Sequence, residues 1–436
     1  MTVRTCRDRV EQTLSRIADP NGEGARACLT VYAQQARAAA DAADARVARA
    51  ASLGPLDGVI VSIKDLFDVA GEVTRAGSKV LAEEAAPATA DAPVVQRLRA
   101  AGAVIVAKTN MTEFAFSGIG ANPHFGTPGN PRDRSRVPGG SSSGAAVAVG
   151  DGLCDIAIGT DTGGSVRVPA ALCGLVGFKP SRQRIPTAGA FPLSKTLDSV
   201  GPIANSVEDC AKADAVMAGE TFTPIEPIAL GGLSFGIAEG LPLDRLDDTV
   251  AAAFVSAAAR FDRAGVHVNH KIVPLFDDMN AVNAKGGVSP PEACAIHRDR
   301  IARRAADIDP NVRLRVERGC AVPQQDYVWM MQERGRLVAA MDTQLGALDA
   351  LIMPTTSIVA PTIAEVEDPK VFAARNAALL RNTSIANFFD LCAISLPLPA
   401  LAGKMPAGLM LIARNGQDRR LLAIAAAAMP LFSPSI

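Results

Sequence analysis

The chain has 436 residues, 48% of them hydrophobic, which is enough to bury a deep core. Lys and Arg number 44 against 45 Asp and Glu, without a block of basic residues. This balance argues against nucleic acid or an anionic membrane as a partner. The first residues lack an apolar signal-peptide core, and no apolar run is long enough to span a membrane. We therefore expect a cytoplasmic protein.

The eight cysteines are scattered, with no Cys-x-x-Cys pair and no grouping with the four histidines. Such scatter is typical of reduced core thiols and not of a disulfide framework or a zinc site. We expect free thiols and no metal.

Taken in chain order, residues 1–52 are rich in Ala and Arg with helical spacing, which predicts one or two surface helices and a candidate homodimer contact. A β-branched run at 59–63 predicts a buried strand that ends at Lys64. Residues 143–152 predict a small-residue helix, residues 154–159 a strand, and the stretch from Pro180 to Gly201 a loop. Further strands are predicted at 103–109, 233–238, 267–273, 350–354, 393–397 and 409–413, and further helices at 91–103, 206–218, 247–264, over much of 285–345, and at the C-terminal end. The helix at 206–218 is predicted to have Ser206 as its N-cap.

This alternation of strands and helices predicts an α/β fold with a mixed central sheet that helices cover on both faces. No shift in composition marks a linker, so we expect residues 1–436 to form one domain.

Two Gly-Gly-Ser turns end at Ser141 and Ser165, on either side of the predicted helix and strand. A Gly-Gly step leaves backbone N–H groups uncovered, so such a turn can hold a serine hydroxyl beside amide donors. A nucleophilic hydroxyl and donors for an oxyanion are the groups that attack on a carbonyl requires. On spacing alone, a plain turn residue is an equally good interpretation of Ser165.

A serine nucleophile needs a base, and the histidines are poor candidates. His267, His270 and His297 lie in strand or helix patterns that indicate surface or structural roles. His124, in a loop rich in Pro and Gly, keeps a smaller chance of a functional role. Residues 140–144 match the Gly-x-Ser-x-Gly elbow of Ser–His hydrolases, but that motif needs a strand before it, and a polar segment broken by proline precedes it here.

Lys64 remains as the candidate base, because a lysine at the end of a buried apolar strand is costly to keep charged. The alternative is that its ammonium extends to solvent or pairs with Asp65. No lysine follows a serine by three positions, and no Gly-x-x-x-x-Gly-Lys phosphate loop is present.

Taken together, these features resemble the amidase signature family. The similar segments are GPLDGVIVSIKDLFDVAG (54–71), VPGGSSSGAAVAVGDGL (137–153) and GTDTGGSVRVPAALCGLVGFKPS (159–181). The similarity spans nearly the whole chain and is densest between 54 and 215. It implies a single amidase signature domain with N-terminal helices at 1–52, a signature core at 54–215, and the rest of the sheet and the specificity region at 216–436.

The resemblance also implies the roles of individual residues. Lys64 corresponds to the catalytic lysine of the family, Ser165 to its acylated serine, and Ser141 to the serine that bridges them. The backbone amides of Thr162, Gly163, Gly164 and Ser165 correspond to the oxyanion hole, and the supporting residues are Ser143, Asp161 and Arg167. The family uses neither a metal nor an organic cofactor, so we expect neither.

The expected function is hydrolysis of the C–N bond of a small aliphatic or aryl carboxamide through an acyl-serine. Two alternatives stay open: the glutaminase (A) subunit of a tRNA-dependent amidotransferase, and a catalytically silent family member that acts as a binding protein. Segments 112–130, 186–200, 320–335 and 353–390 are expected to hold the pocket. They supply Phe114, Phe116, Phe125, Phe191, Trp329, Met330 and Met331 as candidate lining residues.

Three positions depart from the pattern of the family. Gln183 stands where the family has glycine, Cys392 where proline is common, and Met410 where glutamine is frequent. We expect them to change the shape of the surrounding loops and to leave the three reactive positions intact.

Overall fold

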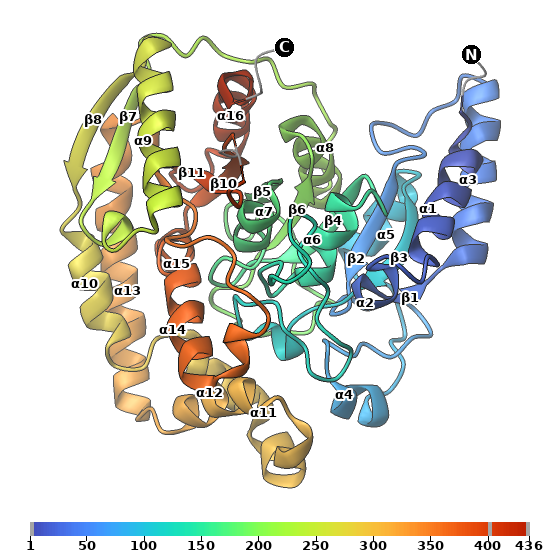
Figure 1. Cartoon of the computed structure of the whole chain (residues 1–436), viewed down its shortest axis with the longest axis horizontal. Helices are drawn as coiled ribbons and strands as arrows, with labels where there is room; N and C mark the ends of the chain where they lie inside the picture. Colours follow the sequence, from blue (N-terminus) through green and yellow to red (C-terminus); the bar gives the residue numbers. More distant parts are fainter. Residues whose placement is uncertain (1–3, 400–402, 433–436) are drawn as a thin grey trace.

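The computed structural model describes residues 4–399 and 403–432 and is built around one sheet of eleven strands (Figure 1). The strands run in the order β1-β3-β2-β4-β6-β5-β10-β11-β9-β7-β8. Their bounds are β1 (Cys28–Val31), β2 (Ile60–Lys64), β3 (Val104–Thr109), β4 (Ile156–Thr160), β5 (Val176–Lys179), β6 (Val200–Ala204), β7 (Ser234–Glu239), β8 (His267–Ile272), β9 (Ala350–Pro354), β10 (Cys392–Pro397) and β11 (Gly408–Ala413).

The sheet is mixed, as predicted. β2 pairs in parallel with β3 and β4, and β7 pairs in parallel with β8 and β9. The strands between these two parallel groups, and β1 at one edge, pair antiparallel with their neighbours.

Helices flank the sheet. The main ones are α1 (Cys6–Ile17), α3 (Ala33–Ala48), α5 (Pro93–Ala100), α6 (Ser143–Gly150), α7 (Arg167–Cys173), α8 (Val207–Ala218), α9 (Asp248–Arg263), α10 (Leu275–Asn283), α11 (Ser289–Arg304), α12 (Pro310–Cys320), α13 (Gln324–Gln344), α14 (Pro369–Leu380), α15 (Thr383–Phe388) and α16 (Asp418–Phe432). Short helices occur at α2 (Gly24–Ala27) and α4 (Lys79–Glu84).

The alternation of side chains along β2 decides where Lys64 lies. Val61 and Ile63 join the core cluster that includes residues of α5, α8, α9 and α16. Ile60 points to the other face, into the cluster with residues of α6. Because strand side chains alternate, Lys64 shares the face of Ile60 and lies under the N-terminal end of α6.

Most predicted elements are confirmed within a few residues, and α8 begins at the predicted N-cap Ser206, whose side chain accepts from the backbone N–H of Asp209. The prediction of a loop through Gly201 is wrong at its end, since Val200–Ala204 is β6, buried between β4 and β5. Strands β1 and β5 and helices α7, α10, α14 and α15 were not predicted.

The prediction of free thiols is wrong for one pair. Cys294 on α11 and Cys320 at the end of α12 form a disulfide. Their separation of 26 residues carries no signal, but α11 and α12 fold back on each other and bring the two Cα atoms to 5.2 Å, within the range that a disulfide allows. The other six cysteines are free thiols.

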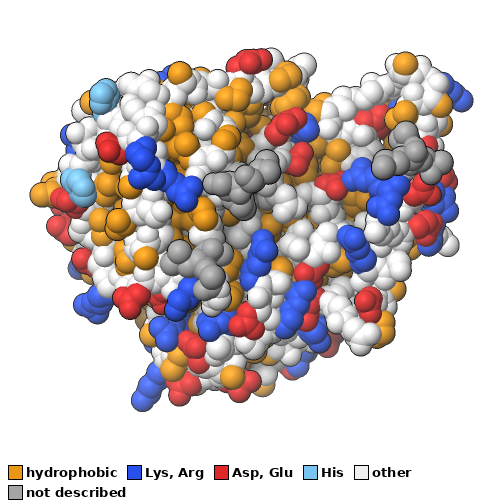
Figure 2. Space-filling model, turned by 45° about the horizontal axis from the view of Figure 1, so that its top comes forward, with side chains coloured by type: hydrophobic (Ala, Val, Ile, Leu, Met, Phe, Trp, Pro, Cys, Tyr) orange, Lys and Arg blue, Asp and Glu red, His pale blue; other side chains and the backbone are white. Residues whose placement is uncertain are grey.

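Across the described residues, no helix combines the length and the apolar character needed to cross a bilayer. On the face shown in Figure 2, basic and acidic side chains are interspersed.

Candidate active site

Lys64 ends β2 with a fully buried side chain. Its Nζ donates to Ser141 Oγ at 2.8 Å and to Thr160 Oγ1 at 2.9 Å. Burial lowers the pKa of Lys64 to about 7, although the negative charges of Asp198 and Asp161 oppose this shift. An amine with a pKa near neutrality is uncharged in a large fraction of molecules and can accept a proton.

Two other lysines are buried, but neither faces a serine. The Nζ of Lys179 donates to the backbone carbonyls of Pro180 and Leu391 at 2.9 and 2.8 Å. The Nζ of Lys108 has no hydrogen bond among the described residues, and its nearest carboxylate oxygen, on Glu72, lies at 3.7 Å. Contact with a serine hydroxyl thus distinguishes Lys64 from these lysines.

Ser141 lies buried in the loop before α6 and follows a cis peptide bond from Gly140. Its carbonyl accepts from the N–H of Thr112 at 3.1 Å. The next residue, Ser142, donates its N–H to the carbonyl of Ser165 at 3.3 Å. The first bond ties the loop of Ser141 to the segment after β3, and the second holds it against the loop that carries Ser165.

Ser165 lies in the loop from β4 to α7, and 4% of its surface is exposed. Among the described residues, none accepts a hydrogen bond from the amide N–H groups of residues 162–165. Uncommitted N–H groups around a serine hydroxyl are suited to holding a developing oxyanion.

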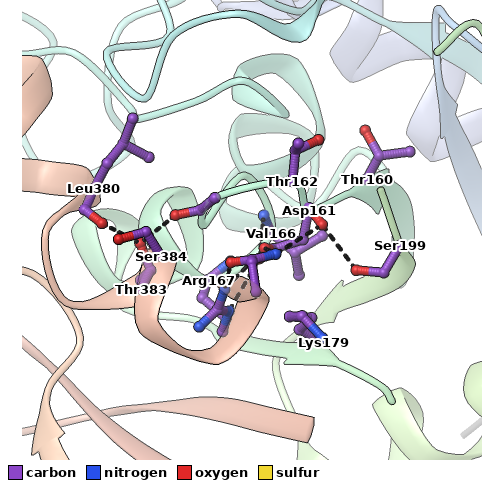
Figure 3. Close-up of polar contacts among 12 residues, drawn as sticks. Thr160, Asp161, Thr162, Val166, Arg167, Lys179, Ser199, Leu380, Thr383 and Ser384 are labelled. Carbon is purple, nitrogen blue, oxygen red and sulfur yellow. Dashed lines mark hydrogen bonds and ion pairs between the residues drawn. The ribbon is translucent and has the colours of Figure 1, made fainter. Parts of the chain in front are cut away.

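Asp161 and Arg167 close this loop with a buried ion pair (Figure 3). The Asp161 carboxylate accepts from Nη2 of Arg167 at 2.8 Å, from its Nε at 3.0 Å, and from the N–H of Val166 at 3.2 Å. Burial by itself would raise the pKa of Asp161, but the Arg167 guanidinium outweighs it and the pKa falls to about 2. The Ser199 hydroxyl, also drawn in Figure 3, donates to the Asp161 carbonyl at 2.8 Å.

Helix α15 supplies two partners that were not predicted. Asn387 donates to the Asp161 carboxylate at 2.9 Å and accepts from Arg167 at 2.7 Å. The Thr383 hydroxyl donates to the Gly163 carbonyl at 2.6 Å (Figure 3). More than 200 residues separate these partners along the chain, so no local pattern could have revealed them.

Asp198 is a third residue that was not predicted. Its carboxylate accepts from the Thr162 hydroxyl at 2.5 Å and from the N–H groups of Leu193 and Ser194 at 3.0 and 3.1 Å. Burial raises the pKa of Asp198 to about 6, against the effect of these hydrogen bonds. The carboxylate thus acts on the Thr162 loop directly and on Lys64 through its charge.

The two glycines of the loop differ in the space around them. A Cβ added to Gly164, which has φ +140°, would lie 2.1 Å from Thr383 Oγ1, whereas the nearest heavy atom to one added at Gly163 is Leu380 Cδ2 at 4.0 Å.

We expect Gly164→Ala to lower kcat/KM for an amide by about 10²–10³-fold, the usual cost of disturbing an oxyanion donor. Gly163→Ala is the matched control and should lower kcat/KM much less. Equal losses of kcat/KM for the two variants in steady-state assays would contradict the close contact between residue 164 and Thr383.

A cavity of about 510 Å³ opens over Ser165, Thr162 and Gly163. Its walls come from residues 115–117, from residues 286–290 at the end of the α10–α11 connection and the start of α11, and from α12, α14 and α15. Ser165 is therefore placed where a bound small molecule can reach it.

The predicted pocket segments contribute only in part to the cavities near Ser165. Phe116 lines the cavity over Ser165, and Phe191 lines a neighbouring one of about 460 Å³. Segment 320–335 supplies none of the described residues that line the cavity over Ser165: Met330 is buried in the core, and Trp329 lies on the surface, 40% exposed.

The predicted supporting residue Ser143, and His124, for which a functional role stayed open, lie outside this arrangement. His124 contacts the Glu113 carboxylate at 3.0 Å and is not among the described residues that line the cavity over Ser165. Ser143 begins α6, and its buried hydroxyl has no hydrogen-bond partner in the described part of the chain. Its supporting role stays a prediction.

The structure shows the backbone conformation or the side-chain contacts of each of the three residues that depart from the family pattern. Gln183 keeps a backbone conformation that favours glycine, with φ +72°. The Met410 sulfur contacts Arg167 Nη1 at 3.1 Å, and the Cys392 thiol donates to the carbonyls of Ala413 and Arg414 at 3.5 and 3.3 Å.

Comparison with known proteins agrees with this picture. The family model described as Amidase matches residues 8–422. The 2-amino-5-chloromuconic acid deaminase of Comamonas testosteroni is 36% identical over 90% of this chain and 85% of its own length. The glutamyl-tRNA(Gln) amidotransferase A subunit of Synechococcus sp. (strain RCC307) is 33% identical over 97% of this chain and 93% of its own length.

Among solved structures, one described as a crystal structure of amidase superposes with a TM-score of 0.88 at 31% identity, covering 99% of this chain and 97% of that one. Fold and relatives together define an enzyme that hydrolyses amide bonds. The chain belongs to the amidase signature family.

Proposed function

We propose that this enzyme cleaves the C–N bond of a small carboxamide through an acyl-serine, with Ser165 as nucleophile, Ser141 as bridge and Lys64 as base. The observation that carries the proposal is the hydrogen bond of 2.8 Å between the buried Lys64 Nζ and Ser141 Oγ. A base buried beside a hydroxyl, with a pKa near 7, is suited to taking up a proton.

The proposed reaction begins when Ser165 Oγ attacks the carbonyl carbon of the amide. The Ser165 proton passes to Ser141 Oγ while the Ser141 proton passes to the lone pair of Lys64 Nζ. The carbonyl oxygen becomes an oxyanion that accepts from the amides of residues 162–165. Protonated Lys64 then returns a proton through Ser141 to the leaving nitrogen, and the C–N bond breaks. Water attacks the acyl-serine by the same relay and releases the carboxylate product.

A panel of primary and secondary amides, assayed for ammonia or amine release, tests this proposal. We expect release from at least one small amide by the purified chain, together with covalent labelling of Ser165 by a fluorophosphonate. Absence of both would overturn it and favour a silent binding protein.

The similarity to an amidotransferase A subunit favours glutaminase activity as the second candidate. In that case glutamine would be the preferred substrate, and partner subunits would co-purify with the chain. Efficient hydrolysis of other amides by the isolated chain would exclude it.

The charge of Asp198 provides a test that depends on pH. Because its carboxylate stabilises the ammonium of Lys64, Asp198→Asn is expected to lower the pKa of Lys64 and move the acid limb of the kcat/KM profile to lower pH. Thr162→Val removes the hydrogen bond but keeps the charge, so its acid limb should stay in place. A shift to higher pH in Asp198→Asn would contradict the assignment of the base.

A further inference from the structure

Arg315 is a cation without a protein partner in the wall of the cavity over Ser165. It lies on α12, and its guanidinium has no hydrogen bond and no ion pair among the described residues. Its Nε is buried. By contrast, the buried Arg334 on the next helix pairs with Asp390. A cation that is partly withdrawn from water without a counter-charge is costly, so its presence beside a reactive site calls for a ligand.

The surroundings of Arg315 hold it in place. Its Cζ lies 4.4 Å from the centroid of the Phe116 ring, a cation–π contact that involves none of its N–H donors in a hydrogen bond. The Cys294–Cys320 disulfide ties α12 to α11, and Gly319 packs so tightly on Pro290 that a Cβ there would lie 2.0 Å from the Pro290 carbonyl oxygen. Burial and the nearby charge of Arg318 lower the pKa of Arg315 to about 10, so it stays charged at neutral pH.

The single positive charge on the cavity wall indicates an anionic ligand. Among the described residues that line it, Arg315 is the one charged side chain, and the others are apolar or carry neutral hydroxyl and amide groups. One guanidinium balances the single charge of a carboxylate and matches its two oxygens. A phosphate carries more charge and would call for further cations.

We infer that Arg315 binds a carboxylate of the substrate, so that the enzyme acts on small amides that also carry a free carboxylate, such as half-amides of dicarboxylic acids. This inference rests on the proposed function, because it assigns the substrate class of the same site. The carboxylate binds to α12 while the amide carbonyl lies at Ser165.

Paired substrates test the inference. Malonamic, succinamic and glutaramic acids are compared with their methyl esters, which keep the amide but lack the charge; ammonia release is measured. We expect the wild-type enzyme to prefer at least one acid over its ester by about 10²-fold in kcat/KM, a typical effect of a desolvated charge pair. Arg315→Met should reduce this preference about 10²-fold, mainly through KM for the acid, and Arg315→Lys should restore part of it.

Arg318→Met is the matched control, since it removes a positive charge from the same helix at an exposed position that does not line the cavity. It should leave the preference for acid unchanged. Fluorophosphonate labelling of Ser165 in Arg315→Met reports whether the catalytic loop is intact. An equal loss of kcat/KM for acids and esters in Arg315→Met, or a preference of the wild-type enzyme for esters, would overturn the inference.

A binding measurement separates this inference from the proposed function. Succinate and glutarate, titrated calorimetrically into the Ser165→Ala variant, should bind and should lose affinity in the Ser165→Ala/Arg315→Met double variant. If these dicarboxylates fail to bind while the wild-type enzyme hydrolyses neutral amides, the role of Arg315 is refuted and the proposed reaction is not. Binding without hydrolysis of any amide by the wild type would instead refute the proposed reaction.

Discussion

Replacing Ser165 by alanine is expected to abolish turnover and fluorophosphonate labelling together. The hydroxyl that forms the acyl-enzyme is lost, and removal of the nucleophile from a serine hydrolase costs about 10⁶-fold in kcat. The small, nearly buried side chain makes no hydrogen bond of its own among the described residues, so the fold should tolerate the change. Mass spectrometry of the labelled protein provides the measurement.

Ser142→Ala is the control for this experiment. Its hydroxyl donates to the Thr160 carbonyl at 3.4 Å and has no place in the proposed relay. This variant should still be labelled at Ser165. Labelling of Ser165→Ala on any other active-site serine would show that the nucleophile lies elsewhere.

Replacing Lys64 by methionine is expected to lower kcat by about 10²–10⁴-fold, the usual contribution of a positioned base. The variant should remain folded, because an apolar side chain of similar length replaces a buried amine. In the wild type, kcat/KM should rise with pH and level off above about pH 7, since Lys64 can accept a proton only when neutral. This acid limb should be absent from the residual activity of Lys64→Met.

Lys108→Met serves as the matched control, since Lys108 is also buried but has no contact with a serine. It should keep both the rate and the acid limb of the wild type. Near-normal hydrolysis by Lys64→Met, with the fold verified by circular dichroism, would rule out Lys64 as the base.

The elements that the sequence predicted were those with strong local signals. The apolar run of β2, the Ser206 cap of α8 and the small-residue helix α6 all carry their pattern within a few residues. In the same way, the position of Lys64 at the end of a buried strand indicated its depressed pKa.

What the sequence did not reveal depends on contacts between distant segments. β6 contains a proline and two small residues, so its pattern resembles a loop until its neighbours β4 and β5 are present. Asn387 and Arg315 meet Ser165 at one cavity only because α15 and α12 fold into its wall. The Cys294–Cys320 pair likewise forms because two helices fold back on each other.

Two separate regions of the chain supply the proposed reactive groups and much of the cavity wall. The proposed reactive groups lie between residues 64 and 165, on or next to β2, α6 and β4, whereas much of the wall comes from residues 283–290, Arg315 and 377–388. Figure 1 shows α11, α12, α14 and α15 grouped beside the first region. Exchange of the second region alone between related enzymes should therefore transfer the choice of substrate while the machinery of bond cleavage stays the same.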